Sequence, residues 1–321
     1  MAQIVLVGLG AGAASALLFA SILSGTPLSI ILAYLAPLPI MIAAIGWSHW
    51  AGLIAALAAA LGLAAGLSSP LFIISFLVAT GLPAWWLGYL ALLGRANPDS
   101  SMEWYPASRL LLWCAAVSAL MVLIIVPTFG MSEDSFRASL QGFFERAVNE
   151  RNASGSSAGP SMTSDEIKRL VDNFITIMPP VTAGVSTLIN VINLYLAARI
   201  VRVSGRLRRP WPDLTAIRFP PLAHGAFAVS FLLPMLPGIL GMAGSVIWAV
   251  MIVAYAMVGV AVLHSLTQPL ASRTFILSAF YLVAVFFWPV MIIVLALIAI
   301  ADAAFNFRGR VGPGSPPTMI Q

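Results

Sequence analysis

Long apolar stretches alternate with short polar breaks along most of this chain. Each stretch has roughly the 20 residues that a helix needs to cross the hydrocarbon core of a membrane. The breaks, such as Ser24-Gly25-Thr26-Pro27, are rich in turn-forming residues. The pattern therefore predicts an all-α, polytopic helical membrane protein with about nine spans, within a range of about eight to ten. The expected spans are 4–23, 28–45, 50–67, 70–93, 108–128, 174–200, 219–240, 243–265 and 275–303.

One sizeable polar stretch, residues 129–173, interrupts the apolar pattern. We expect it to lie outside the membrane, as an insertion in a single integral membrane domain that covers residues 1–310. Its apolar residues recur near helical spacing, which predicts an amphipathic helix lying on the membrane surface. These apolar residues are Phe136, Leu140, Phe143, Phe144 and Val148.

The end of this insertion carries a helix-start signal. Thr163 is followed three residues later by Glu166, which is the pattern of a capping box. We expect a helix to begin there and to run into the sixth span. The Ser- and Gly-rich residues 154–161 predict a break before it, and residues 311–321 predict a disordered tail.

The scarcity of charge restricts both the location and the chemistry of the protein. Charged residues make up 8% of the chain, against about a quarter in an average soluble protein. No Asp, Glu, Lys or Arg precedes Arg95. Proton relays and hydrolytic sites in membranes rely on ionisable residues inside the spans, so we expect no enzymatic activity. With Cys114 as the single cysteine and three scattered histidines, we also expect no metal site and no cofactor.

The arginines indicate the orientation of the chain. The net charge of +5 comes from loops beside the spans, so we interpret it as an orientation signal and not as a sign of nucleic-acid binding. Residues 201–218 hold five arginines and one aspartate, which favours the cytoplasmic side of a bacterial inner membrane, with the N-terminus also inside. Three further spans would leave Arg308 and Arg310 outside. Either one span is re-entrant, or residues 275–303 form a pair split around Pro289.

The glycines near the N-terminus imitate a dinucleotide-binding fingerprint, Gly8-x-Gly10-x-x-Ala13. That site would need a soluble parallel sheet and an acidic residue about twenty positions further on, yet no acidic residue precedes Asp99. Gly8 and Gly12 lie four residues apart, a spacing that permits close helix packing in lipid. We therefore predict packing and reject the cofactor interpretation.

Two features make up the candidate binding site. Pro37 and Pro39 remove backbone donors from the second span and predict a kink or a break, and broken helices at membrane depth often line a cavity. Asn190 and Asn193 lie three residues apart on one face of the sixth span, where an unpaired amide is costly. Each feature also has a structural interpretation: a kink packed against its neighbours, and amides that bond adjacent helices.

Other polar residues near the ends of spans favour structural roles. Asp302 ends the last apolar run, six residues before Arg308, and either pairs with a neighbouring arginine or terminates the helix near the headgroups. His224 and His264 are expected at the interface. A further group of residues lies at a predicted membrane boundary, where aromatic residues anchor helices. This group is Trp104, Tyr105 and Pro106.

Several segments together resemble the YybS-like family of bacterial membrane proteins, over roughly residues 1–310. That family is similar, at a distance, to the substrate-binding membrane subunits of energy-coupling-factor vitamin transporters. The resemblance implies a small-molecule-binding subunit that works with a separate ATPase or coupling subunit, because the sequence itself has no Gly-x-x-x-x-Gly-Lys-Ser/Thr phosphate loop. The segments are the charge-free four-span opening, Trp104-Tyr105-Pro106, Asn190 and Asn193 before a basic loop, and Asp302-Ala-Ala-Phe-Asn-Phe-Arg308.

These observations lead to two hypotheses of different kinds. The first is a transporter, or a substrate-binding subunit, for a neutral or apolar small molecule bound near Asn190 and Asn193. The alternative is a structural or assembly scaffold of the membrane without a small-molecule ligand. In both cases the bilayer is a partner of the chain and nucleic acid is not.

Overall fold

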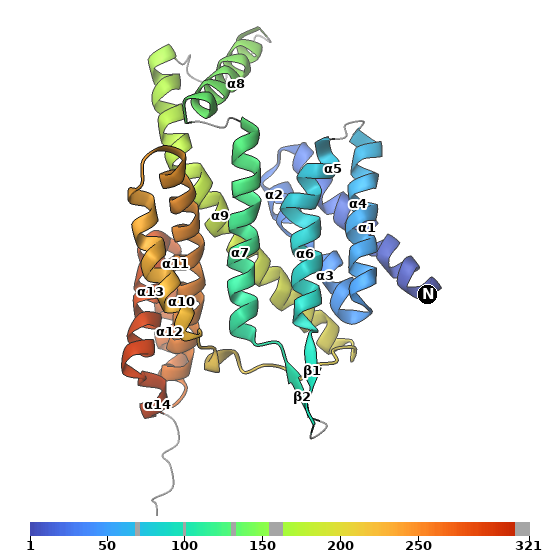
Figure 1. Cartoon of the computed structure of the whole chain (residues 1–321), viewed down its shortest axis with the longest axis vertical. Helices are drawn as coiled ribbons and strands as arrows, with labels where there is room; N and C mark the ends of the chain where they lie inside the picture. Colours follow the sequence, from blue (N-terminus) through green and yellow to red (C-terminus); the bar gives the residue numbers. More distant parts are fainter. Residues whose placement is uncertain (68–70, 99–100, 130–132, 154–162, 312–321) are drawn as a thin grey trace, which may run out of the picture.

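The computed structural model of the chain describes every residue except 68–70, 99–100, 130–132, 154–162 and 312–321. The described part is a helical bundle with one short β-hairpin (Figure 1). Within it, eight helices are long and apolar enough to cross a membrane, which confirms the predicted polytopic all-α fold. The break expected at 154–161, and the expected tail from residue 312 on, lie outside the described residues. The eight helices are Ala2–Ser24, Pro27–Gly46, His49–Leu67, Ile73–Ala91, Ala107–Thr128, Asp165–Val203, Gly238–Thr267 and Trp288–Phe305.

The first and third spans pack through glycine. A Cβ atom added at Gly12 of α1 (Ala2–Ala20) would lie 2.7 Å from the carbonyl oxygen of Ala55 in α4 (His49–Leu67). A Cβ atom at Gly8 would lie 2.7 Å from a side-chain carbon of Ile54. Contacts this short leave no room for a side chain, so the prediction that these glycines serve close packing is confirmed.

The second and fourth spans join this group through Ala44. A Cβ atom at Gly52 or at Gly88 would lie 2.6 Å from the Ala44 Cβ atom, so Ala44 fits between two helices that glycine brings close. The second span is divided into α2 and α3, as its prolines predict. The elements are α2 (Pro27–Tyr34), α3 (Pro37–Gly46), α5 (Leu71–Phe76), η2 (Leu77–Gly81) and α6 (Leu82–Ala91).

A short hairpin leads from the fourth span to the fifth, at the lower end of the bundle in Figure 1. Gly94 of its first strand lies opposite Trp104 of its second. The fifth span then runs to the polar insertion at the other end of the bundle. The elements are β1 (Gly94–Ala96), β2 (Met102–Trp104), α7 (Ala107–Ile125) and η3 (Val126–Phe129).

The polar insertion folds onto the sixth span. Phe136 and Leu140 of α8 (Glu133–Ala153) are buried with Val171 and Ile175 of α9 (Ser164–Val203). The apolar face of this amphipathic helix packs against α9, and its position at the membrane surface stays a prediction. Of the other residues in the predicted stripe, Phe144 packs edge-on against Phe174 of α9, whereas the side chains of Phe143 and Val148 lie outside the described part.

α9 (Ser164–Val203) is long enough to serve both the insertion and the membrane domain. Its 40 residues correspond to about 60 Å at 1.5 Å per residue, about twice the thickness of the hydrocarbon core. The predicted capping box is confirmed: Glu166 N donates to Thr163 Oγ1, and Thr163 N donates to Glu166 Oε2 at 2.7 Å. Pro179 and Pro180 lie inside this helix without ending it.

The last third of the chain departs from the predicted spans in two places. The predicted span 219–240 is a shorter helix followed by a 3₁₀ turn, and the predicted span 275–303 is two helices that separate at Phe287, beside Pro289. The structure therefore selects the split pair. The elements are α10 (Pro221–Leu232), η5 (Leu233–Met235), α11 (Gly238–Thr267), α12 (Arg273–Phe286), α13 (Trp288–Phe305) and α14 (Phe307–Val311).

The split pair returns the chain to the side from which it came. Arg308 Nη1 donates to Thr215 O at 2.7 Å, so the end of α13 lies against the connection between α9 and α10. His264, near the end of α11, lines the same cavity as Thr215. α12 has 14 residues, or about 21 Å, which is less than a full crossing. Arg308 and Arg310 consequently join the arginines of residues 204–219 on one side, which we call the basic face.

Two apolar cores meet at α7 and α9. The N-terminal core is built around α3, α4 and α6, and the C-terminal core around α11 and α13. Alternate faces of α7 serve the two cores: Leu110 and Cys114 belong to the first, Leu111 and Ala115 to the second. The pair α7 and α9 is therefore a seam between two packed halves.

Candidate functional site

The broken second span and the sixth span meet directly. In a regular helix the N–H of Leu38 would bond the Tyr34 carbonyl, but here it bonds Leu35 O, next to Pro37. Asn193 Nδ2 donates to the Tyr34 carbonyl at 2.9 Å. The sequence-predicted break and the sequence-predicted amide are thus parts of one contact, in which α9 satisfies the backbone that the prolines disrupt. Pro39 lies in the first turn of α3, two residues after Pro37.

Asn190 makes a second interhelical contact. Its Nδ2 donates to Ser118 Oγ of α7 at 3.0 Å, and this hydroxyl donates to Cys114 O at 2.8 Å. Asn190 and Asn193 are both buried. The Oδ1 atom of Asn193 is buried and has no hydrogen-bond partner among the described residues. Both amides therefore lie in the seam, where they tie α9 to α2 and to α7.

A cavity of about 760 Å³ lies on the other face of α9, toward the basic face. Asn190 and Asn193 do not line it, whereas their neighbours Val191 and Leu194 do. Its volume is within the range of small-molecule sites, about 300–1,000 Å³. The wall is mainly apolar and comes from α7, α9, α11 and residues 207–217. The lining includes Leu110, Leu111, Cys114, Val191, Ile192, Leu194, Tyr195, Ala198, Leu207, Leu214, Ile217, Met257, Val260 and Ala261.

The mouth of the cavity has exposed side chains from membrane helices. Ile192 and Tyr195 of α9 are 52% and 44% exposed, and Tyr281 of α12 is 42% exposed. Tyr195 lies eight residues before the end of α9 at Val203, or about 12 Å along the helix. These exposed side chains place the opening on the outer surface of the helices, toward the basic face.

Polar groups collect at the end of the cavity nearest the basic face. They include Arg209, Thr215 and His264, with the indole of Trp211 beside them. Arg209 Nη1 donates to Ala91 O at the end of α6, at 3.0 Å. A cation at this position also interacts favourably with the negative end of the helix dipole. Burial lowers the pKa of the Arg209 guanidinium below its ordinary value, because desolvation disfavours the charged form.

A buried ion pair holds the connection that forms this end of the cavity. Arg308 Nη2 lies 2.8 Å from Asp302 Oδ2, and the side chains are 6% and 2% exposed. Arg308 Nη1 donates to the carbonyls of Thr215 and Ile217 at 2.7 and 2.9 Å. Of the two interpretations of Asp302, the structure shows pairing with an arginine. We call these four residues the C-terminal latch.

The remaining residues singled out in the sequence lie at the ends of helices. Trp104 ends β2, Tyr105 N donates to Leu93 O at 2.8 Å, and Pro106 is the N-cap of α7. Tyr105 also accepts a hydrogen bond from Trp113 Nε1. These contacts fix the start of the fifth span. Among the described residues, no group of three or more His, Cys, Asp or Glu is placed to hold a metal ion.

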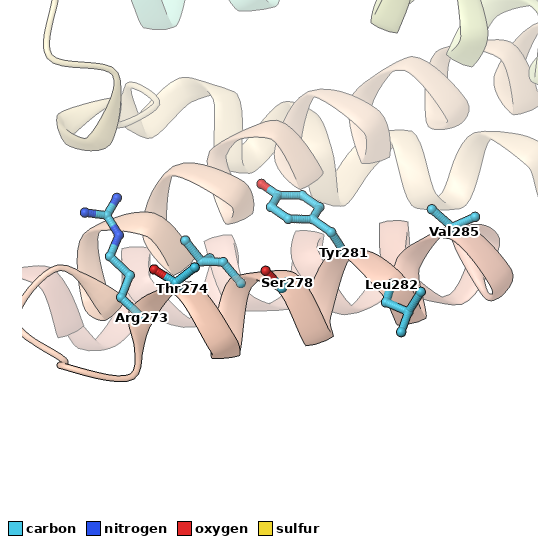
Figure 2. A pocket seen from close by; sticks show the side chains of 7 residues that line it. Arg273, Thr274, Ser278, Tyr281, Leu282 and Val285 are labelled. Carbon is cyan, nitrogen blue, oxygen red and sulfur yellow. The ribbon is translucent and has the colours of Figure 1, made fainter.

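A second, shallower hollow follows the surface of α12. Figure 2 shows its side chains, all from one helix between Arg273 and Val285. Tyr281 points toward the neighbouring helices, where its hydroxyl lies 3.5 Å from His264 Nε2, and Leu282 points away. Tyr281 lines both hollows, so α12 forms one edge of the cavity mouth.

Comparison with known families agrees with this architecture. The family model described as "Predicted membrane protein (DUF2232)" matches residues 13–303. The chain belongs to this family. No curated protein and no solved structure matches the chain. Membership in the family supports an integral membrane protein with several spans.

The cavity was missed in the sequence because its residues carry no distinctive chemistry. They come from segments that are far apart in the chain, and most of them are apolar like the cores. The one local signal is Arg209-Pro210-Trp211-Pro212, in which two prolines restrict the backbone around an aromatic residue. A tryptophan fixed beside arginines in a short connection is unusual enough to have suggested a site at this end.

Proposed function

We propose that this family member is a transporter, or the substrate-binding subunit of one, for a small molecule with an apolar body. The observation that carries the proposal is the apolar cavity of about 760 Å³ between α7, α9 and α11, with its mouth at Ile192 and Tyr195. A ligand that enters through this mouth comes from the bilayer. The sequence resemblance described above implies the same role, and a separate ATPase or coupling subunit is part of the proposal.

The position of the site revises the sequence hypothesis. Asn190 and Asn193 remain close to the cavity in sequence, but their donors are used by Ser118 and Tyr34. We therefore assign binding to the cavity face of α9 and a supporting role to the amides. The basic face is proposed to lie in the cytoplasm of a bacterium, following the positive-inside tendency.

Binding of hexadecanol, a neutral probe with an apolar body, tests the proposal. Native mass spectrometry of the purified chain in detergent should detect hexadecanol bound to the wild type. Ala261→Phe places a large side chain in the cavity and should weaken this binding about tenfold or more. Ala226→Phe, at an exposed position of α10, is the matched control and should bind like the wild type. Equal binding by both variants would contradict the proposal.

The scaffold alternative has one observation in its favour. None of the residues of α12 is buried, and large apolar side chains such as Val285 and Phe286 are 72% and 73% exposed. Lipid contact explains such a surface as well as protein contact does. Co-purification of a protein partner that is lost on Phe286→Ser, with no bound small molecule in the wild type, would favour the scaffold.

A further inference from the structure

We infer that the ligand of this cavity is an anionic amphiphile, whose acidic headgroup binds at Arg209 while its apolar chain lies along α9. This inference rests on the proposed function, because it names the class of ligand for the same cavity. It replaces the neutral ligand that the sequence suggested by one with a negative charge.

The first argument is the state of Arg209. A guanidinium has five N–H donors, and the described residues provide Arg209 with one hydrogen bond, to the neutral Ala91 carbonyl. Its Nε atom is buried without a partner. Half-buried charges are normally paired. The wall of the cavity contains no Asp or Glu among the described residues, so the charge has no counter-ion there.

The second argument is that the nearby acids and arginines are already engaged. Asp213 Oδ1 accepts hydrogen bonds from both the N–H and the hydroxyl of Thr215, and Asp302 is held by Arg308. Two other arginines lie over aromatic rings: Arg202, at the end of α9, over Trp211, and Arg206 of the basic face over Trp47. Arg209 is the cation that lines the cavity and lacks such a partner.

The third argument is the gradient of polarity along the cavity. Arg209, Thr215 and His264 gather at the basic face, and apolar residues such as Val191 and Ile192 extend from them into the membrane half. The mouth lies at exposed side chains of α9, which is one of the candidate membrane helices. A molecule with an acidic head and a long apolar chain matches both ends, whereas a soluble anion would leave the apolar wall empty.

Probes with one chain and different heads test the inference. We compare hexadecyl phosphate, hexadecanol and zwitterionic hexadecylphosphocholine by native mass spectrometry on the intact chain. The wild type should bind hexadecyl phosphate about tenfold or more tightly than hexadecanol, the gain typical of a hydrogen bond to a charged group. Arg209→Gln should remove this preference and leave the binding of hexadecanol. Arg208→Gln, its exposed neighbour outside the cavity wall, should keep the preference.

The outcomes separate the inference from the function on which it rests. Absence of binding of all three hexadecyl probes by the wild type would overturn the proposed function. Equal binding of hexadecanol and hexadecyl phosphate, or equal effects of the two arginine variants, would overturn the inference alone. Inorganic phosphate that stabilises the protein as much as hexadecyl phosphate would also overturn it, in favour of a soluble anion. If Arg209→Gln does not fold, Arg209→Lys keeps the charge and must keep the preference.

Discussion

The two halves of this molecule differ in what holds their helices together. In the N-terminal core, four spans without a single charged residue pack through glycine and alanine, with Ala44 fitted between Gly52 and Gly88. The C-terminal core uses such a contact where Gly259 meets Leu295, but a buried ion pair between Asp302 and Arg308 closes it at the basic face.

This difference explains where a ligand can bind. Small residues let the backbones of neighbouring helices come into contact, so no space remains between these helices. Such helices also need no polar bonds to hold them together. Where the two halves meet, beside the irregular connection 204–219, the helices α7, α9 and α11 leave the cavity between them, and its wall includes residues of both cores. The C-terminal latch holds that connection. The predictions below test this contrast.

Removing Arg308 should have the largest effect. Arg308→Met leaves the Asp302 carboxylate buried without a counter-charge and frees the Thr215 and Ile217 carbonyls. We expect a loss of about 3–5 kcal/mol in the free energy of unfolding, and weaker binding in the cavity. Arg310→Met, at an exposed position, should leave both nearly unchanged. Unfolding in detergent measures the difference, and equal stability of the two variants would refute the latch.

Filling the contact between α1 and α4 should have the next largest effect. A Cβ atom at Gly12 would lie 2.7 Å from Ala55 O, whereas one at Gly10 meets nothing within 4 Å. Gly12→Leu should therefore destabilise the protein by about 3 kcal/mol through overpacking, and Gly10→Leu should be close to neutral. The midpoints of thermal unfolding compare the stability of these two variants, whose substitutions lie in the same helix. Similar midpoints would show that the N-terminal core is loosely packed.

Substitution in the seam between the halves should have the smallest effect on stability. Asn193→Ala removes the bond to the Tyr34 carbonyl, and interhelical bonds of this kind are worth about 0.6 kcal/mol on average and about 1.7 at most. We expect a loss of about 1 kcal/mol. Thr187→Val is the control, because the buried Thr187 hydroxyl bonds Ala183 O of its own helix. A loss of several kcal/mol for Asn193→Ala alone would mean that the seam, and not the two cores, sets the stability.

Sequence patterns predicted the parts of the fold that depend on neighbouring residues. The capping box at Thr163, the break at Pro37 and the glycine contact at Gly12 each involve a local rule of helix formation or packing. For the polar insertion, the sequence predicted the amphipathic helix but not its partner. The amphipathic pattern of α8 shows that its apolar face needs a partner, but not that the partner is α9.

The site depended on long-range contacts that no local pattern encodes. Asn193 was singled out by its residue type, yet its partner is a backbone carbonyl of Tyr34, and every residue has such a carbonyl. The cavity is built from apolar residues on both sides of the seam, and position alone distinguishes Ile192 from a core residue. The turn at Phe287 reverses the chain inside an apolar run, so counting spans left the side of Arg308 open.

Photoaffinity mapping with a hexadecyl chain that carries a diazirine tests the location of the binding site most directly. After irradiation of the intact chain in lipid nanodiscs, peptide mass spectrometry locates the modified residues. The account predicts modification of α7 and α9 at the cavity wall, around Leu110 and Ile192, and its loss in Ala261→Phe. Modification confined to the exposed face of α12, unchanged in Ala261→Phe, would contradict it.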